Sequence, residues 1–143
     1  MSSVYVSKEL CRRVAQDAAH RCGYCLSSEV VTGTPLTIEH LIPHALGGPT
    51  EIGNLWLACW SCNLSKGARI SALDPQSGRS VRLFNPREQI WNEHFAWEDS
   101  GVRILGKTEI GRATVEALRL NRPVVMDRET GLGGGGLHPP KTS

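Results

Sequence analysis

The sequence lacks an apolar run long enough to cross a bilayer. Its N-terminal segment also lacks the basic stretch and the apolar core of a secretory signal peptide. We therefore expect a cytoplasmic protein with no membrane partner. Its 143 residues, of which 40% are hydrophobic, suit one compact domain with modest extensions and leave little room for a second large domain.

A strong charge of either sign is also absent, since 16 Lys and Arg stand against 14 Asp and Glu, a formal net charge of +2. This balance by itself identifies no polyanionic partner. The distribution says more, because residues 66–82 carry only one acidic residue, Asp74, against four basic ones: Lys66, Arg69, Arg79 and Arg82. A phosphate-bearing partner would explain this segment, and so would an ordinary solvated basic surface.

The five cysteines are not arranged as a disulfide framework. Four of them form two Cys-x-x-Cys pairs, Cys22/Cys25 and Cys59/Cys62, and this spacing predicts a tetrahedral Zn²⁺ site of four thiolates. Four buried free cysteines are the alternative, but they would leave the repeated spacing unexplained. Coordination of this kind is closed, so the zinc would be structural. Cys11 lies on the apolar face of a predicted helix and is not expected to be a ligand.

Hydrophobic periodicity and capping residues predict a mixed α+β chain. Helices are expected over residues 8–20, from Ser61 to about Ser71, after Asn85-Pro86 with Ile90, Trp91 and Phe95, and from the cap Thr108 to Asn121. Strands are expected over 36–42, 54–58 and 79–84, and in a small hairpin of 95–97 with 102–105. The aromatic residues from Phe84 to Trp97 are interpreted as packing rather than as a base-stacking platform.

Glu39 and His40 lie in the first strand of the hairpin predicted between the cysteine pairs. A carboxylate is a hard oxygen ligand for Mg²⁺, and an imidazole can accept a proton from water at neutral pH. A histidine satisfied in the hairpin core is the alternative for His40. Strand alternation puts the two side chains on opposite faces unless the strand end bends, and Pro43 is compatible with a bend.

Two asparagines and one lysine complete the candidate site. Asn63, directly after Cys62, offers a second hard oxygen ligand that the zinc site would hold across the hairpin from Glu39, although a capping asparagine would look the same. Asn54 is placed to hydrogen-bond the intervening loop and fix His40, or is a plain turn asparagine. Lys66 lies one helical turn after Asn63, where a phosphate contact and a solvated lysine are both reasonable.

Two further residues are assigned more simply. Arg69 continues the basic segment, and we assign it with Lys66 to phosphate contact. His44 stands four residues after His40, a spacing that would suit a zinc pair on a helix. Pro43 lies between them and the flanking pattern is that of a strand, so we reject this pair.

In combination these motifs resemble the HNH endonuclease family, the ββα-metal nucleases. The matching motifs are Cys22-x-x-Cys25, Glu39-His40-Leu41-Ile42-Pro43, Gly47-Gly48, Asn54-Leu55 and Cys59-x-x-Cys62-Asn63-x-x-Lys66, over about residues 20–70. The family name abbreviates His-Asn-His, and this chain has Asn63 in place of the second histidine, as many members do. Glu39 stands where many members have aspartate. The resemblance implies a ββα-metal core, which would occupy residues 1–72 together with an N-terminal helix.

The resemblance also implies hydrolysis of a DNA phosphodiester bond, with double-stranded DNA as the expected partner. His40 would deprotonate the attacking water, and Asn54 would hold this base in place. Glu39 and Asn63 would hold one divalent cation such as Mg²⁺, and the products would carry 5′-phosphate and 3′-hydroxyl ends.

The segment from about Asp74 to Pro123 resembles the C-terminal extension of a bacterial group of small HNH proteins, and the extension as a whole is expected to span residues 73–128. We expect this extension to pack on the core and to offer further arginines to phosphate, namely Arg79, Arg82, Arg87, Arg103 or Arg112. Residues 129–143 are glycine-rich, and we expect them to form a flexible tail.

Two other classes of function stay open: a zinc-bearing nucleic-acid-binding module without activity, and a structural zinc scaffold for a protein complex. No base-reading helix is evident, so no target sequence is predicted, and no oligomeric state is predicted either.

Overall fold

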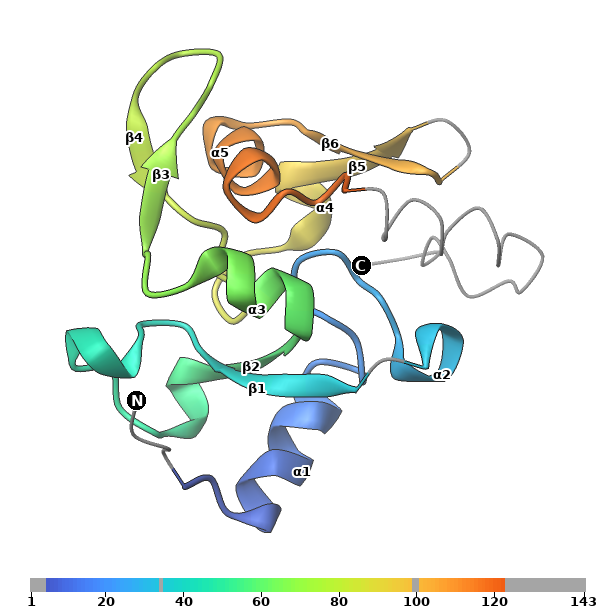
Figure 1. Cartoon of the computed structure of the whole chain (residues 1–143), viewed down its shortest axis with the longest axis vertical. Coiled ribbons are helices and arrows are strands. Elements are labelled where there is room, and N and C mark those ends of the chain that lie inside the picture. The colour runs from blue at the N-terminus through green and yellow to red at the C-terminus, as the bar shows by residue number, and fades with distance from the viewer. Residues whose placement is uncertain (1–4, 34, 99–100, 123–143) are drawn as a thin grey trace.

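The computed structural model describes residues 5–33, 35–98 and 101–122, and Figure 1 shows how the elements are arranged. The predicted tail lies outside the described residues. In chain order, the elements are α1 (Lys8–Asp17), α2 (Glu29–Thr32), β1 (Leu36–His40), η1 (His44–Leu46), η2 (Ile52–Asn54), β2 (Leu55–Cys59), α3 (Trp60–Lys66), β3 (Ser71–Leu73), β4 (Ser80–Arg82), α4 (Trp91–His94), β5 (Phe95–Glu98), β6 (Arg103–Gly106) and α5 (Glu109–Leu118). None of the helices described here has both the length and the apolar character needed to span a membrane.

A hairpin and the helix after it form the centre of the molecule. β1 and β2 pair antiparallel, with Glu39 opposite Trp56 and His40 opposite Leu55. Helix α3 follows β2 directly and packs on both strands, and in Figure 1 it lies between this hairpin and α5. The predicted α+β fold with a ββα core is therefore confirmed.

Helix α1 covers the hairpin through an apolar stripe. Ser7 caps it, since its hydroxyl accepts a hydrogen bond from the backbone N–H of Leu10 at 3.1 Å. Val14, on the buried side, packs with Leu55 and Leu57 of β2. The predicted end near residue 20 was wrong: the helix stops at Asp17, because residues 19 and 20 take positive φ angles of 53° and 59°.

The predicted end of one further helix and the predicted start of another were also wrong. Helix α3 stops at Lys66, short of the expected end near Ser71, because Gly67 adopts a φ of 57°. Residues 67–70 are not helical, and β3 begins at Ser71. After Asn85-Pro86 the chain makes a turn instead of a helix, held by a 2.9 Å hydrogen bond from Arg87 N to Asn85 Oδ1. Helix α4 begins only at Trp91.

Two other features predicted in the extension, its small hairpin and the cap of its last helix, are present, although this helix ends at Leu118. β5 and β6 form the predicted hairpin, and Thr108 caps α5 by accepting a 3.0 Å hydrogen bond from Gly111 N. One apolar core joins the extension to the cysteines, and its extension members are Leu83, Phe84, Trp91, Phe95, Ile104, Leu118 and Leu120. Phe95 lies 5.1 Å from both Phe84 and Trp91 between ring centroids, so these aromatic residues pack the interior as predicted.

Candidate functional site

The two cysteine pairs meet in a buried cluster. Their four Sγ atoms all lie within 4.8 Å of one another, and none of the four is in a disulfide. Cys25 Sγ and Cys59 Sγ are 3.8 Å apart. Tetrahedral zinc with Zn–S bonds of about 2.3 Å requires sulfur atoms about 3.8 Å apart, so the cluster fits a Zn²⁺ ion bound by four cysteines.

The protonation of these thiols reflects their crowding. Hydrogen bonds from Cys22, Cys25 and Cys62 hold the pKa of the Cys59 thiol far below its usual value. Burial, in contrast, raises the pKa of the Cys22 thiol. The cluster therefore favours a mixture of thiol and thiolate before metal binds, and thiolate is the form that ligates zinc.

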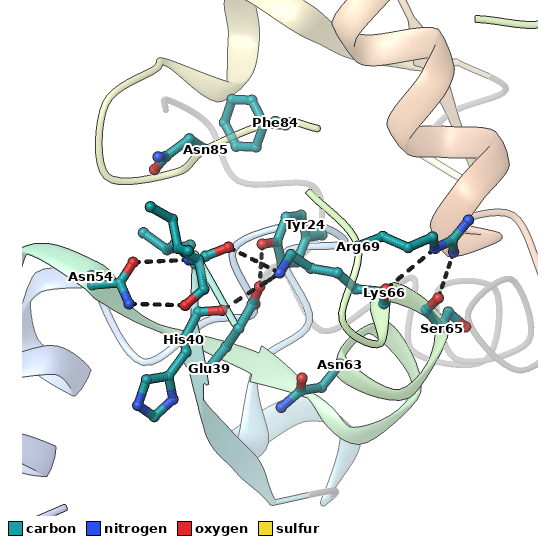
Figure 2. A network of polar contacts seen from close by, with 12 residues as sticks. Tyr24, Glu39, His40, Asn54, Asn63, Ser65, Lys66, Arg69, Phe84 and Asn85 are labelled. Carbon is teal, nitrogen blue, oxygen red and sulfur yellow. Dashed lines mark hydrogen bonds and ion pairs between the residues drawn. The ribbon is translucent and has the colours of Figure 1, made fainter. Parts of the chain in front are cut away.

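The carboxylate of Glu39 is buried on the zinc side of the hairpin, with 2% of the residue exposed. Its Oε2 accepts a 2.6 Å hydrogen bond from the Tyr24 hydroxyl and lies 3.1 Å from Lys66 Nζ (Figure 2). Burial raises the pKa of Glu39, and the charge of Lys66 with the Tyr24 hydrogen bond offsets this only in part. Oε1 is buried and has no hydrogen-bond partner among the described residues, so its lone pairs are free to bind a hard cation.

His40 faces away from Glu39, as strand alternation requires. Its ring is half-exposed, and Nε2 lies 2.9 Å from Thr50 Oγ1. The His44 ring is 6.3 Å away between centroids. Burial lowers the pKa of His40, and positive charge on His44 and Lys66 lowers it further. A neutral imidazole at physiological pH is the form that can act as a general base.

Asn54 ties together the two ends of the loop between β1 and β2. Its Oδ1 accepts a 2.8 Å hydrogen bond from Ile42 N, and its Nδ2 donates to Ile42 O at 3.0 Å and to Pro49 O at 2.9 Å. Gly48 lies against the same carbonyl of Ile42, where a Cβ would collide with the oxygen. These contacts hold in place the loop that carries Thr50 to His40.

Asn63 is half-exposed and donates a 3.0 Å hydrogen bond from Nδ2 to Thr37 Oγ1. Thr37 and Glu39 lie two residues apart on β1, so both face the side of the hairpin that α3 covers. In Figure 2 the Asn63 amide and the Glu39 carboxylate nevertheless point in different directions, and no contact described here joins them.

A family model described as HNH endonuclease matches residues 22–69. The match begins at the first zinc cysteine and spans the second pair and the hairpin with its loop. Residues 22–69 thus resemble an HNH endonuclease domain, and the name HNH domain refers below to these residues. Searches of curated proteins and of solved structures found no match.

Within the HNH domain, Lys66 is buried, so its side chain is not accessible for the phosphate contact that the sequence predicted. The residue is only 3% exposed, and its Nζ lies 3.1 Å from both Glu39 Oε2 and Leu41 O. Arg69 is exposed, although its Nη2 also donates to Ser65 O at 2.6 Å and to Ala117 O at 3.0 Å. A phosphate contact by Arg69 stays a prediction.

The extension offers less free positive charge than its arginine count implied. Four of the five arginines predicted to contact phosphate form ion pairs within the molecule: Arg79–Glu109, Arg87–Asp17, Arg103–Glu98 and Arg112–Asp74. Arg82, the fifth, is exposed.

Sequence reasoning missed three residues that contact the candidate site. Tyr24, inside the first Cys-x-x-Cys, binds Glu39, and Thr50, in the loop, binds His40. Arg122 reaches the sulfur atoms of Cys59 and Cys62. A tyrosine between two zinc ligands is a signal that could have been used, whereas Thr50 and Arg122 stand in no motif.

Proposed function

We propose that the protein is a metal-dependent DNA endonuclease that hydrolyses a phosphodiester bond and leaves 5′-phosphate and 3′-hydroxyl ends. The observation that carries this proposal is the arrangement of His40. Its half-exposed imidazole, with a lowered pKa, is bonded to Thr50 in a loop clamped by Asn54. A nucleic-acid substrate follows from the HNH domain itself.

In this mechanism Nε2–H of His40 donates to Thr50 Oγ1, which leaves the lone pair on Nδ1. Nδ1 accepts a proton from water as the water oxygen forms a bond to phosphorus. The bond from phosphorus to the 3′-oxygen breaks, and the leaving oxygen takes up a proton from solvent water to become the 3′-hydroxyl. Asn54 keeps its hydrogen bonds throughout and so maintains the distance between His40 and Thr50.

Glu39 and Asn63 are the residues that would hold a divalent cation such as Mg²⁺, which would neutralise charge on the phosphate and the leaving group. The unpartnered Oε1 of Glu39 supports this assignment. Asn63 would have to release Thr37, and Lys66 would give up part of its contact with Glu39.

The test is cleavage of supercoiled plasmid with Mg²⁺ or Mn²⁺ by zinc-loaded protein. Wild type should nick or linearise the plasmid, and His40→Ala should reduce the rate by about 10²–10⁴-fold. His44→Ala is the matched control, because this exposed imidazole lies in the same loop and is assigned neither as the base nor as a metal ligand. Cleavage by His40→Ala at the wild-type rate would exclude His40 as the base.

A zinc-containing nucleic-acid-binding module without activity is the second candidate. The buried ion pair of Lys66 with Glu39 favours it, because a cation of the protein itself already neutralises the carboxylate. Retarded migration of a DNA duplex, together with intact plasmid across several divalent metals, would select this alternative.

A further inference from the structure

Arg122, just after α5, reaches out of the extension to the zinc ligands of the HNH domain. Its Nη2 lies 3.3 Å from Cys62 Sγ and 3.5 Å from Cys59 Sγ. Its Nη1 donates to the carbonyl oxygens of Leu118 at 3.0 Å and Arg119 at 2.9 Å. The guanidinium is thus held between the last turn of α5 and the second cysteine pair.

The contact of Arg122 with Cys59 and Cys62 places a positive charge beside the zinc site. A Zn²⁺ ion with four thiolates carries a formal charge of about −2, and all four cysteines are buried here. A buried charge is costly unless it is paired and hydrogen-bonded. The backbone N–H of Tyr24 and the hydroxyl of Ser27 also lie near Cys22 and Cys25, but both groups are neutral. An arginine supplies a permanent positive charge and several donors at once.

The extension also contacts the first cysteine pair. Trp91 Nε1 donates a 2.9 Å hydrogen bond to the carbonyl oxygen of Tyr24, which lies between Cys22 and Cys25. Trp91 is itself part of the apolar core that includes the cysteines. Both halves of the zinc site are therefore bonded to residues outside the matched HNH domain.

We propose that Arg122 is a positioning residue of the zinc site that balances the thiolate charge, so that docking of the extension raises the zinc affinity of the HNH domain. The proposal assigns a role to the extension and does not depend on nuclease activity. Outer residues that bond to metal ligands typically contribute 10–100-fold to metal affinity.

Competition between the full-length protein and a chromophoric zinc chelator tests the proposal. Arg122→Gln should weaken zinc binding by about 10–100-fold. Arg122→Lys, which keeps the charge but loses the fork of donors, should fall between this variant and wild type, and it supplies the measurement if the glutamine variant does not fold. Arg119→Gln is the matched control, since it removes the same charge from the same turn.

Alkylation of the zinc-loaded protein by iodoacetamide, mapped by mass spectrometry, separates a specific effect from general loosening. A thiolate that loses an N–H···S hydrogen bond is more nucleophilic. Loss of Arg122 should therefore speed alkylation of Cys59 and Cys62 several-fold relative to Cys22 and Cys25. Equal acceleration of all four, or a zinc affinity of Arg122→Gln no lower than that of Arg119→Gln, would overturn the proposal.

Discussion

Glu39 and His40 are neighbours in the sequence but differ in environment. Glu39 is buried against Lys66 and Tyr24, whereas His40 is half-exposed and bonded to Thr50. Because successive side chains of a strand point to opposite faces, one dipeptide presents both a buried carboxylate and a half-exposed imidazole.

The pH dependence of cleavage should report the lowered pKa of His40. Only neutral imidazole accepts a proton, so kcat/KM should rise with pH through this pKa, with its inflection below 6.5, the ordinary value for histidine. His44→Gln removes a neighbouring positive charge and should move the inflection upward. Rates on an oligonucleotide duplex between about pH 5 and pH 8 measure both effects. An inflection above 6.5 in wild type would contradict the assignment.

Thr50 should matter to catalysis through His40. Thr50→Val keeps the shape of the side chain but removes the hydroxyl that bonds Nε2, so the ring loses its orientation. One such hydrogen bond contributes about 1 kcal/mol, and we expect kcat to fall about 5-fold with KM unchanged. Thr50→Ser retains the hydroxyl and should stay near wild type. A fall in kcat for the serine variant equal to that for valine would instead point to packing.

Lys66 should stabilise the folded state by neutralising Glu39. Lys66→Met leaves a buried carboxylate without its cation, which should lower the free energy of unfolding by about 3–5 kcal/mol. The loss should shrink at low pH, because the raised pKa of Glu39 lets this carboxyl take up a proton early. Urea unfolding of zinc-loaded protein measures both effects.

The double variant Glu39→Gln with Lys66→Met is the control for this prediction, since it removes both charges of the pair. It should be more stable than Lys66→Met alone. A double variant that is less stable would show that the ion pair is not the source of the loss.

At the scale of elements, the loop between β1 and β2 depends on close contact between backbones. A Cβ at Gly48 would collide with Ile42 O and crowd the Asn54 amide, so Gly48→Ala should disrupt the clamp that holds His40 and Thr50 together. Overpacking of this kind costs about 1–3 kcal/mol of stability, and cleavage should fall with it.

Gly53→Ala is the matched control for the loop, because a Cβ at this position meets nothing within 4 Å. It should leave both stability and cleavage near wild type. Thermal unfolding measures the stability of the two variants, and a plasmid assay on the same samples measures their cleavage. Equal behaviour of the two variants would mean that the loop can adjust to a side chain at Gly48.

At the scale of the whole molecule, the HNH domain and the extension share one apolar core, with Phe84, Trp91 and Leu118 packed around the buried cysteines. We therefore expect one cooperative unfolding transition. Removal of zinc by a strong chelator should unfold both parts together, because the cysteines that would separate lie inside the shared core. Tryptophan fluorescence and far-UV circular dichroism should change in parallel. Release of zinc without a change in the environment of Trp91 would contradict this prediction.

Local features of the site could be predicted from the sequence, because they depend on covalent spacing. Two Cys-x-x-Cys pairs direct four thiolates to one point, Thr108 caps the helix that follows it, and the alternation of β1 separates Glu39 from His40. The helix ends were predicted less well, since Ala19, His20 and Gly67 end their helices through backbone angles that hydrophobic periodicity does not record.

Only the tertiary structure decided which distant groups meet. Lys66 turns inward to Glu39, Asn63 binds Thr37, and Arg122 reaches Cys59 and Cys62 from the far end of the described chain. The local sequence pattern around each of these side chains is equally compatible with exposure to solvent. Their partners were set by how the extension and α3 pack on the hairpin, because burial makes an unpaired charge or amide costly and selects the contact that satisfies it.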